Sequence, residues 1–176
     1  MKILAFAAGS SSNSINKKLV TYATSLLNNA EVEILDINDY EMPLFSEDRE
    51  KELGQPDAAK EFFNKIGAAD ALLIAFAEHN GSYTAAYKNL YDWASRIEPG
   101  VYQGKPIVML ATSPGPGGAR NVLATAKTSA PFGGGDVKAD LSLARFYDIF
   151  DTEAKRLSDA DAQAQLEDAL AYLNQL

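Results

Sequence analysis

A glycine followed by hydroxyl and amide side chains lies near the start of the chain and could hold a phosphate. The segment is residues 9–16, G-S-S-S-N-S-I-N, between an apolar run at residues 2–8 and an amphipathic stretch that begins at residue 14. A bound phosphate needs free backbone N–H groups, hydroxyl donors and the positive end of a helix dipole. A loop between a strand and a helix offers all three, so we interpret this segment as an anion-binding loop.

The pattern departs from two common phosphate motifs. It lacks the Gly-Lys-Ser/Thr of a Walker loop and the three spaced glycines of a Rossmann loop. A serine-rich turn can also cap a helix without any ligand, because Ser and Asn side chains satisfy the free N–H groups of the first turn. From this segment alone, phosphate binding and simple capping both remain open.

Two further glycine-containing loops are expected after buried strands. The first is A-E-H-N-G-S-Y at residues 77–83, where Asn-Gly favours a tight turn with positive φ that exposes backbone N–H donors to a flat heterocycle. The alternative is a plain strand-to-helix turn with Ser82 as the helix cap. The second is S-P-G-P-G-G-A-R at residues 113–120. Its two prolines restrict the backbone, and its three glycines would let a ligand approach the backbone closely.

The elements that must position these loops alternate along the chain. Periodicity predicts strands at residues 2–8, 31–37, 70–76, 105–111 and 137–143, and helices at 14–28, 57–67, 85–97, 117–129 and 158–173. Such alternation predicts a parallel sheet with helices on both faces. We therefore expect one domain over residues 1–176 with a three-layer α/β/α flavodoxin-like fold and strand order 2-1-3-4-5. Its ligand would sit outside the carboxyl ends of the first and third strands.

Composition excludes several classes of site and partner. The 176 residues contain no cysteine and one histidine, which excludes disulfides and thiolate chemistry and argues against a His-rich metal site. The net charge of −8 repels nucleic acid and anionic membranes. No apolar run is long enough to cross a bilayer, and the first strand is too short for a signal peptide, so we expect a cytoplasmic protein.

The polar stretch at residues 38–55 is long for a connection inside a compact domain. It contains the apolar run Met42-Pro43-Leu44-Phe45. We expect either a solvated acidic loop pinned by Leu44 and Phe45 or a lid over the site.

Taken together, the motifs resemble the NAD(P)H-dependent FMN reductases of the flavodoxin-like superfamily, a group that also contains chromate, quinone and azo-dye reductases. The resemblance rests on G-S-S-S-N-S-I-N, on A-E-H-N-G-S-Y followed by Y-K-N-L-Y-D-W-A-S-R, and on S-P-G-P-G-G-A-R. It covers the chain from the first predicted strand to the fourth predicted helix. The second motif is the most specific of the three.

The resemblance implies a set of FMN-binding residues and no metal. The phosphate would be held by Ser10, Ser12, Ser14, Ile15 and Asn16; the isoalloxazine edge would be lined by Glu78, His79, Asn80, Gly81 and Ser82; and the other side would be closed by Ser113, Pro114, Gly115 and Gly118. No side chain would be needed as a nucleophile or base. His79 would be a wall of the flavin pocket and not a catalytic acid.

Two departures from the family pattern stand out. Ala77-Glu78-His79 replaces the common Pro-Glu-Tyr, and the first loop lacks the arginine that many members carry. A missing arginine removes a charge-assisted hydrogen bond to the phosphate. We therefore expect weaker FMN binding unless Lys17 or Lys18 compensates.

Helix 85–97 carries two stripes of large side chains. Ala86, Leu90, Trp93 and Ile97 are expected to face the sheet, and Tyr83, Tyr87 and Tyr91 form a second, aromatic line. The second line could be extra core. Because the family resemblance implies dimers or tetramers that use this helix, we expect a homo-oligomer with this line in its interface.

The activity that the resemblance implies is ping-pong electron transfer from NAD(P)H through FMN to a small acceptor. A non-enzymatic electron carrier of the flavodoxin type shares the fold and would suit the acidic surface, so it remains the alternative. A receiver-type signalling module is excluded, because Ala7, Ala8 and Ala77 stand where Mg²⁺-binding acids would be needed.

Overall fold

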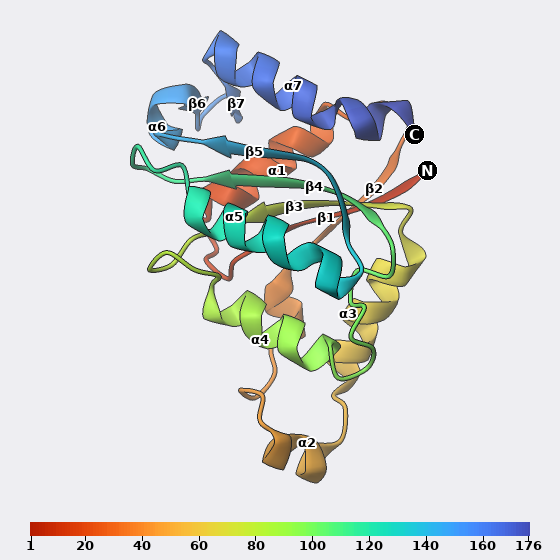
Figure 1. Cartoon of the computed structure of the whole chain (residues 1–176). Coiled ribbons are helices and arrows are strands. Elements are labelled where there is room, and N and C mark those ends of the chain that lie inside the picture. The colour runs from red at the N-terminus through yellow and green to blue at the C-terminus, as the bar shows by residue number, and fades with distance from the viewer.

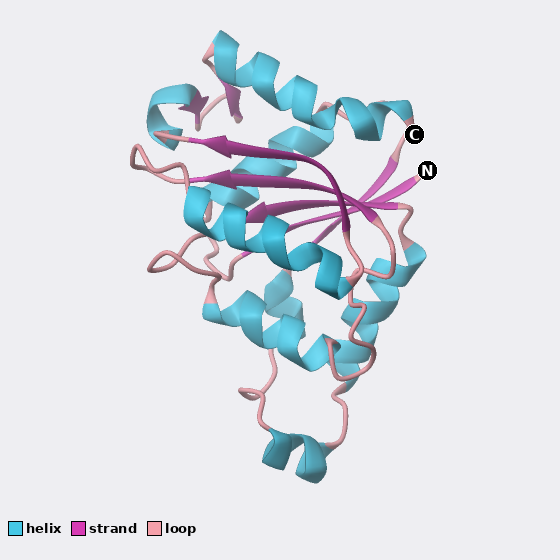
Figure 2. Ribbon diagram, in the orientation of Figure 1, coloured by secondary structure: helices cyan, strands magenta, loops and turns pink.

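The protein is built around a five-stranded parallel sheet, whose strands are labelled in Figure 1 and drawn in magenta in Figure 2. The computed structural model describes residues 1–176. The strands are β1 (Lys2–Ala8), β2 (Glu31–Leu35), β3 (Ala71–Phe76), β4 (Pro106–Thr112) and β5 (Asp136–Leu143). Their spatial order is β2-β1-β3-β4-β5 and every pair is parallel, which confirms the predicted fold and order.

Helices cover both faces of this sheet. The helices of the chain are α1 (Ile15–Ser25), α2 (Glu47–Leu53), α3 (Asp57–Ala68), α4 (Ala85–Ala94), α5 (Arg120–Ser129), α6 (Phe146–Ile149) and α7 (Ala160–Gln175), with 3₁₀ turns η1 (Ile37–Tyr40) and η2 (Ala130–Gly133). Helix α2 has no buried residue and lies away from the sheet (Figure 1). Helices α1 and α7 lie on one face, and α3, α4 and α5 lie on the other (Figure 1). None of the helices is long and apolar enough to span a bilayer.

Two apolar layers form the core, one on each side of the sheet. In β1, Ile3 and Ala5 pack under α1 and α7, whereas Leu4 and Phe6 pack under α3 and α4. All six residues of β3 are buried. A strand between two helical layers has no solvent-facing side, which is why its sequence reads as one apolar run.

Some predicted helix boundaries were wrong. The first helix ends at Ser25 rather than residue 28, α4 ends at Ala94 rather than 97, and α5 begins at Arg120 rather than 117. Gly118 and Ala119 have positive φ values of 62° and 57°, so the chain cannot enter a helix before residue 120.

The segment at residues 38–55 is more ordered than a solvated loop, because η1 and α2 occupy much of it. Leu44 does not pin it, since its side chain is 69% exposed. Phe45 does contribute, with its ring edge-on to Trp93 at 5.1 Å between centroids. The Trp93 indole also donates a hydrogen bond of 2.7 Å to the Pro43 carbonyl. In α4, Trp93 therefore packs against this segment, contrary to its predicted place on the sheet.

The aromatic line of α4 is only partly at the surface. Tyr87 is buried against Phe6 and Phe76, and its hydroxyl pairs with that of Tyr102 at 2.6 Å. Burial raises the pKa of both hydroxyls far above the ordinary range of tyrosine. Tyr87 is therefore core, which corrects its predicted place in an interface, while Tyr83 and Tyr91 remain half-buried.

Residues 144–157 form structure that the sequence did not predict. The short helix α6 follows β5 and leads into an antiparallel hairpin of β6 (Phe150–Asp151) and β7 (Arg156–Leu157). Figure 1 places α6 and the hairpin beside the carboxyl end of β5 and the α1 face of the sheet.

Candidate functional site

Three loops meet at the carboxyl edge of the sheet and surround a cavity of about 260 Å³. They follow β1, β3 and β4, as the fold predicts for its ligand site. The lining includes Gly9, Ser11, Asn13, Ser14, Ile15 and Asn16 from the first loop, Ala77, Glu78 and His79 from the second, Thr112, Ser113 and Pro114 from the third, and Tyr147 from α6.

The first loop presents backbone donors without protein partners. The N–H groups of residues 9–13, 15 and 16 donate to no acceptor in the protein. Ser14 caps α1 by accepting the Lys17 N–H at 3.3 Å, and the first turn of α1 contains no acidic residue. Capping thus uses one donor and leaves the others free at the positive end of a helix, an arrangement suited to an anion.

The Asn16 side chain joins the first loop to the third. Its amide donates to the Thr112 carbonyl at 3.1 Å and its oxygen accepts the Thr112 N–H at 3.0 Å, and both residues are buried. Both polar atoms of the carboxamide are therefore bound to the third loop. The backbone N–H of Asn16 has no protein partner and is available to a ligand.

A second contact joins the carboxyl end of β1 to the start of α4. The buried Thr84 hydroxyl donates to the Ala8 carbonyl at 3.0 Å and accepts the Tyr87 N–H at 3.2 Å. Thr84, not Ser82, is thus the cap of α4. The loops also approach closely at Gly9, where a Cβ would lie 3.0 Å from the Ala77 Cβ.

The predicted tight turn after β3 is present. Asn80 and Gly81 have φ values of 53° and 75°, and His79 and Ser82 exchange two backbone hydrogen bonds of 3.0 and 3.1 Å. The N–H groups of His79 and Ser82 are therefore used within the turn. Asn80, Gly81 and Ser82 are exposed and lie outside the cavity lining, so this loop offers fewer free donors to the cavity than predicted.

Glu78 lines the cavity but its carboxylate serves α5. It accepts the Val122 N–H at 2.9 Å. Helix α5 needs this bond, because its N-cap residue Ala119 has no side chain that can cap. Glu78 therefore fixes the second loop to α5.

The third loop contributes Ser113 and Pro114, while its predicted glycines serve the scaffold. The Gly115 carbonyl accepts the Arg145 N–H at 2.9 Å. A Cβ at Gly118 would meet the Ser142 Oγ at 2.4 Å, so glycine there permits close packing against β5. Neither glycine lines the cavity.

Tyr147 is a cavity residue that sequence reasoning missed. It is 61% exposed, whereas its neighbour Phe146 is buried and stacks on Phe150 at 4.6 Å. The Phe146 N–H donates to the Ser113 carbonyl at 3.0 Å, which ties this turn to the third loop. Because the turn is anchored and the ring is exposed at the cavity wall, a flat ligand could stack on the Tyr147 ring. The only sequence signal was the Phe-Tyr pair after the last strand.

The remaining first-loop serines face other hollows. Ser10 lines a hollow that is also lined by Ile37 and Tyr40. Ser12 lines a different cavity along α1, and Ser14 lines both the cavity along α1 and the central cavity.

The two lysines that follow the loop do not line the central cavity either. The Lys17 ammonium pairs with Asp36 at 2.5 Å, and its hydrogen bond is the main cause that lowers the pKa of that carboxyl. Lys18 lines the cavity along α1. Neither therefore stands in for the missing arginine. No group of three or more His, Asp or Glu side chains lies close enough together to hold a metal ion.

Two curated proteins illustrate what this chain resembles in sequence. An NAD(P)H-dependent FMN reductase of Pseudomonas aeruginosa is 37% identical over 116 residues, which cover 65% of this chain but only 61% of that protein. A 2-hydroxy-1,4-benzoquinone reductase of a Burkholderia species is 29% identical over 175 residues, covering 98% of this chain and 90% of that protein.

A solved structure shares the fold across the whole chain. The flavoenzyme NAD(P)H:(acceptor) oxidoreductase of Paracoccus denitrificans superposes with a TM-score of 0.82 at 22% identity, covering 99% of this chain and 95% of that one. Residues 1–147 also match the family described as NADPH-dependent FMN reductase. With the family's pattern spanning all three loops and reaching Tyr147, the chain belongs to the NADPH-dependent FMN reductase family.

Proposed function

We propose that this protein is an FMN-dependent oxidoreductase that takes electrons from NAD(P)H and gives them to a small acceptor of the quinone class. The observation that carries the proposal is the row of unpartnered backbone donors at the start of α1, facing a cavity walled by two further loops. Family membership and the names of the relatives support it.

The residues present fit FMN at both ends of the cavity. Near the phosphate end, the first-loop residues that both line the cavity and have free N–H groups are Gly9, Ser11, Asn13, Ile15 and Asn16. They would meet an anion without any acid in the first turn of α1. Near the ring end, Pro114 and Tyr147 offer apolar surface. Of the predicted residues, Ser14, Ile15, Asn16, Glu78, His79, Ser113 and Pro114 line this cavity.

Bound FMN would supply the redox chemistry, accepting a hydride from NAD(P)H and then reducing the acceptor in a separate, ping-pong half-reaction. The chain's own residues would bind FMN and fix its orientation. The backbone donors of the first loop hold the phosphate end, and the bond from Glu78 to Val122 keeps the second loop in place. No side chain in the cavity is required as nucleophile or base.

The protein would act as a homo-oligomer through α4, in the cytoplasm. Tyr83 and Tyr91 are half-exposed, and Phe132 is 86% exposed. Phe132 lies near Tyr91, because the Tyr91 hydroxyl packs against Gly133, the residue that follows Phe132. These rings form an apolar surface that a second copy could cover. Light scattering should give a dimer or larger, and a monomer would remove this part of the proposal.

Two measurements test the proposed activity. FMN added to the desalted protein should lose fluorescence and bind one per chain, and the loaded protein should oxidise NADPH or NADH in the presence of a benzoquinone. FMN binding with negligible nicotinamide oxidation would instead favour the electron carrier, which the net charge of −8 also suits. A chain that binds no FMN would refute both.

A further inference from the structure

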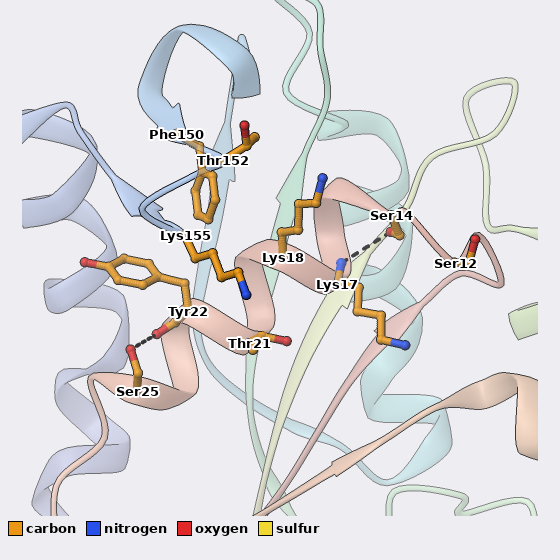
Figure 3. A pocket seen from close by; sticks show the side chains of 10 residues that line it. All are labelled: Ser12, Ser14, Lys17, Lys18, Thr21, Tyr22, Ser25, Phe150, Thr152 and Lys155. Atoms are coloured by element: carbon orange, nitrogen blue, oxygen red, sulfur yellow. Dashed lines mark hydrogen bonds between the residues drawn. The ribbon is translucent and has the colours of Figure 1, made fainter.

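A second cavity, of about 330 Å³, lies between α1 and the β6–β7 hairpin (Figure 3). Lys18, Thr21 and Tyr22 of α1 line one side, and Phe150 and Lys155 of the hairpin line the other. Nothing in the proposed function uses it.

The charge of this cavity opposes that of the molecule. The chain carries −8 overall, yet three lysines and no acidic residue line this hollow. Lys17 is paired with Asp36, but Lys18 and Lys155 take part in no ion pair. Two ammonium groups are thus available to an anion, and phosphate is an anion that lysine binds well.

The hairpin holds Lys155 in place over α1. The Asp151 carboxylate accepts the N–H groups of Glu153 and Ala154 at 2.9 Å each, which fixes the turn. Lys155 itself has a φ of 55°, a conformation that non-glycine residues seldom adopt. In Figure 3 its side chain runs across the cavity toward Thr21.

The cavity also has flat apolar walls and free hydroxyls. The rings of Tyr22 and Phe150 are edge-on at 6.0 Å between centroids, and the Tyr22 hydroxyl is held by Gln163 at 2.7 Å. The side chains of Thr21 and Thr152 also line the cavity and offer hydroxyls to a sugar or phosphate oxygen. The aromatic rings could pack against the base of a nucleotide, the hydroxyls could bind its ribose, and the ammonium groups could bind its phosphate.

We propose that this cavity binds a phosphorylated adenosine, the part that NADPH shares with free adenine nucleotides. The site lies beside the central cavity, because Ser14 lines both. The inference rests on the proposed function in taking the dinucleotide as the expected source of that group. Binding there would hold the phosphorylated end of the dinucleotide by Lys18 and Lys155.

The test is calorimetry of FMN-loaded protein with adenosine 2′,5′-bisphosphate. Lys18→Gln and Lys155→Gln should each weaken binding by about tenfold, because each removes a charge-assisted bond to phosphate. Lys51→Gln is the matched control: it removes the same charge from an exposed lysine of α2 with no ion pair, and affinity should stay within twofold. Thr21→Trp should block the site by filling it without a change of charge.

Equal affinity in all four variants, or no binding by the native protein, would overturn the inference. Circular dichroism of each variant separates loss of the site from loss of the fold. Inorganic phosphate should bind much more weakly than the bisphosphate, and equal affinity for the two would refute the role given to Tyr22 and Phe150.

Competition identifies the source of the ligand. If NADP⁺ displaces the bisphosphate and both Gln variants raise the KM for NADPH while the maximal rate holds, the site belongs to the dinucleotide. If NADP⁺ leaves the bisphosphate bound, the site takes a free adenine nucleotide. The same titration of the FMN-free chain distinguishes the two proposals, because failed FMN binding would refute the proposed function and leave the bisphosphate result standing.

Discussion

At the scale of single residues, polar side chains around the central cavity mostly bind the protein's own backbone. Asn16 binds Thr112, Thr84 binds Ala8, and Glu78 binds Val122. The first two contacts tie a helix start to the carboxyl end of a strand, and the third ties the second loop to the start of α5. The ligand surface that remains is largely backbone N–H, held in shape by these side chains.

Replacing Asn16 should therefore cost stability as well as cofactor affinity. Asn16→Ala leaves the buried N–H and carbonyl of Thr112 without partners, and we expect a loss of about 2–4 kcal/mol in urea unfolding. Asn13→Ala is the control, because Asn13 is exposed and should change stability by less than about 0.5 kcal/mol. Equal stability of the two variants would show that the Asn16 bonds do not anchor the third loop.

Tyr147 should contribute to FMN affinity through its ring. Tyr147→Ala should raise the FMN dissociation constant by about two- to tenfold, the range expected for one aromatic contact, and Tyr147→Phe should stay close to the native value. Fluorescence titration measures both. Because Tyr147 is 61% exposed, neither change should shift the unfolding midpoint appreciably. Unchanged affinity in the alanine variant would remove Tyr147 from the site.

At the scale of elements, the sheet was predictable and the contacts between its loops were not. The apolar runs of β1, β3 and β4 reflect burial on both faces, which leaves a plain local pattern. The Asn16–Thr112 bonds join residues 96 positions apart and leave no such pattern. The β6–β7 hairpin was missed because two-residue strands carry too little periodicity to detect.

The segment at residues 38–55 shows how one long-range contact decides an element's behaviour. The sequence pattern indicates Leu44 and Phe45 as anchors of this segment. In the structure Leu44 is exposed, and the segment is held by Phe45 and by the Trp93 bond to Pro43. A tryptophan in a helix gives no sign of which distant carbonyl it will meet. Its role appears only when the chain is folded.

Trp93→Phe should loosen this segment more than the rest of the fold. The variant loses the indole bond to Pro43 and part of the packing on Phe45, at a cost of about 1–3 kcal/mol. Trypsin should then cleave faster at Arg49 and Lys51, as mass spectrometry of the fragments can measure. Leu44→Ala should leave the cleavage rate unchanged. Faster cleavage of the Leu44→Ala variant would show that Leu44 also anchors the segment.

At the scale of the whole molecule, an excess of acidic groups makes the response to pH informative. The Lys17 ammonium and the Asn38 N–H lower the pKa of Asp36 in the folded protein. A carboxyl with a lowered folded pKa stabilises the fold above its unfolded pKa of about 3.9 and loses that contribution as pH falls through the folded value.

Asp36→Asn should therefore destabilise the protein at neutral pH and make no difference in strong acid. Both partners are partly exposed, so the loss at pH 7 should be only about 0.5–1 kcal/mol. Once the pH is below the lowered folded pKa of Asp36, the two proteins should unfold at nearly the same urea concentration. Asp168→Asn, an exposed carboxyl in the middle of α7 without an ion pair, should match the native protein throughout. A gap between native and Asp36→Asn that persists in acid would contradict the ion pair as its cause.

The proposed electron transfer is tested most directly by anaerobic mixing of FMN-loaded protein with NADPH, followed by visible absorbance in single turnover. The flavin absorbance should bleach quickly in one step and return when a quinone is added without oxygen. Flavin that binds to the central cavity but is not bleached by NADPH or NADH would contradict it.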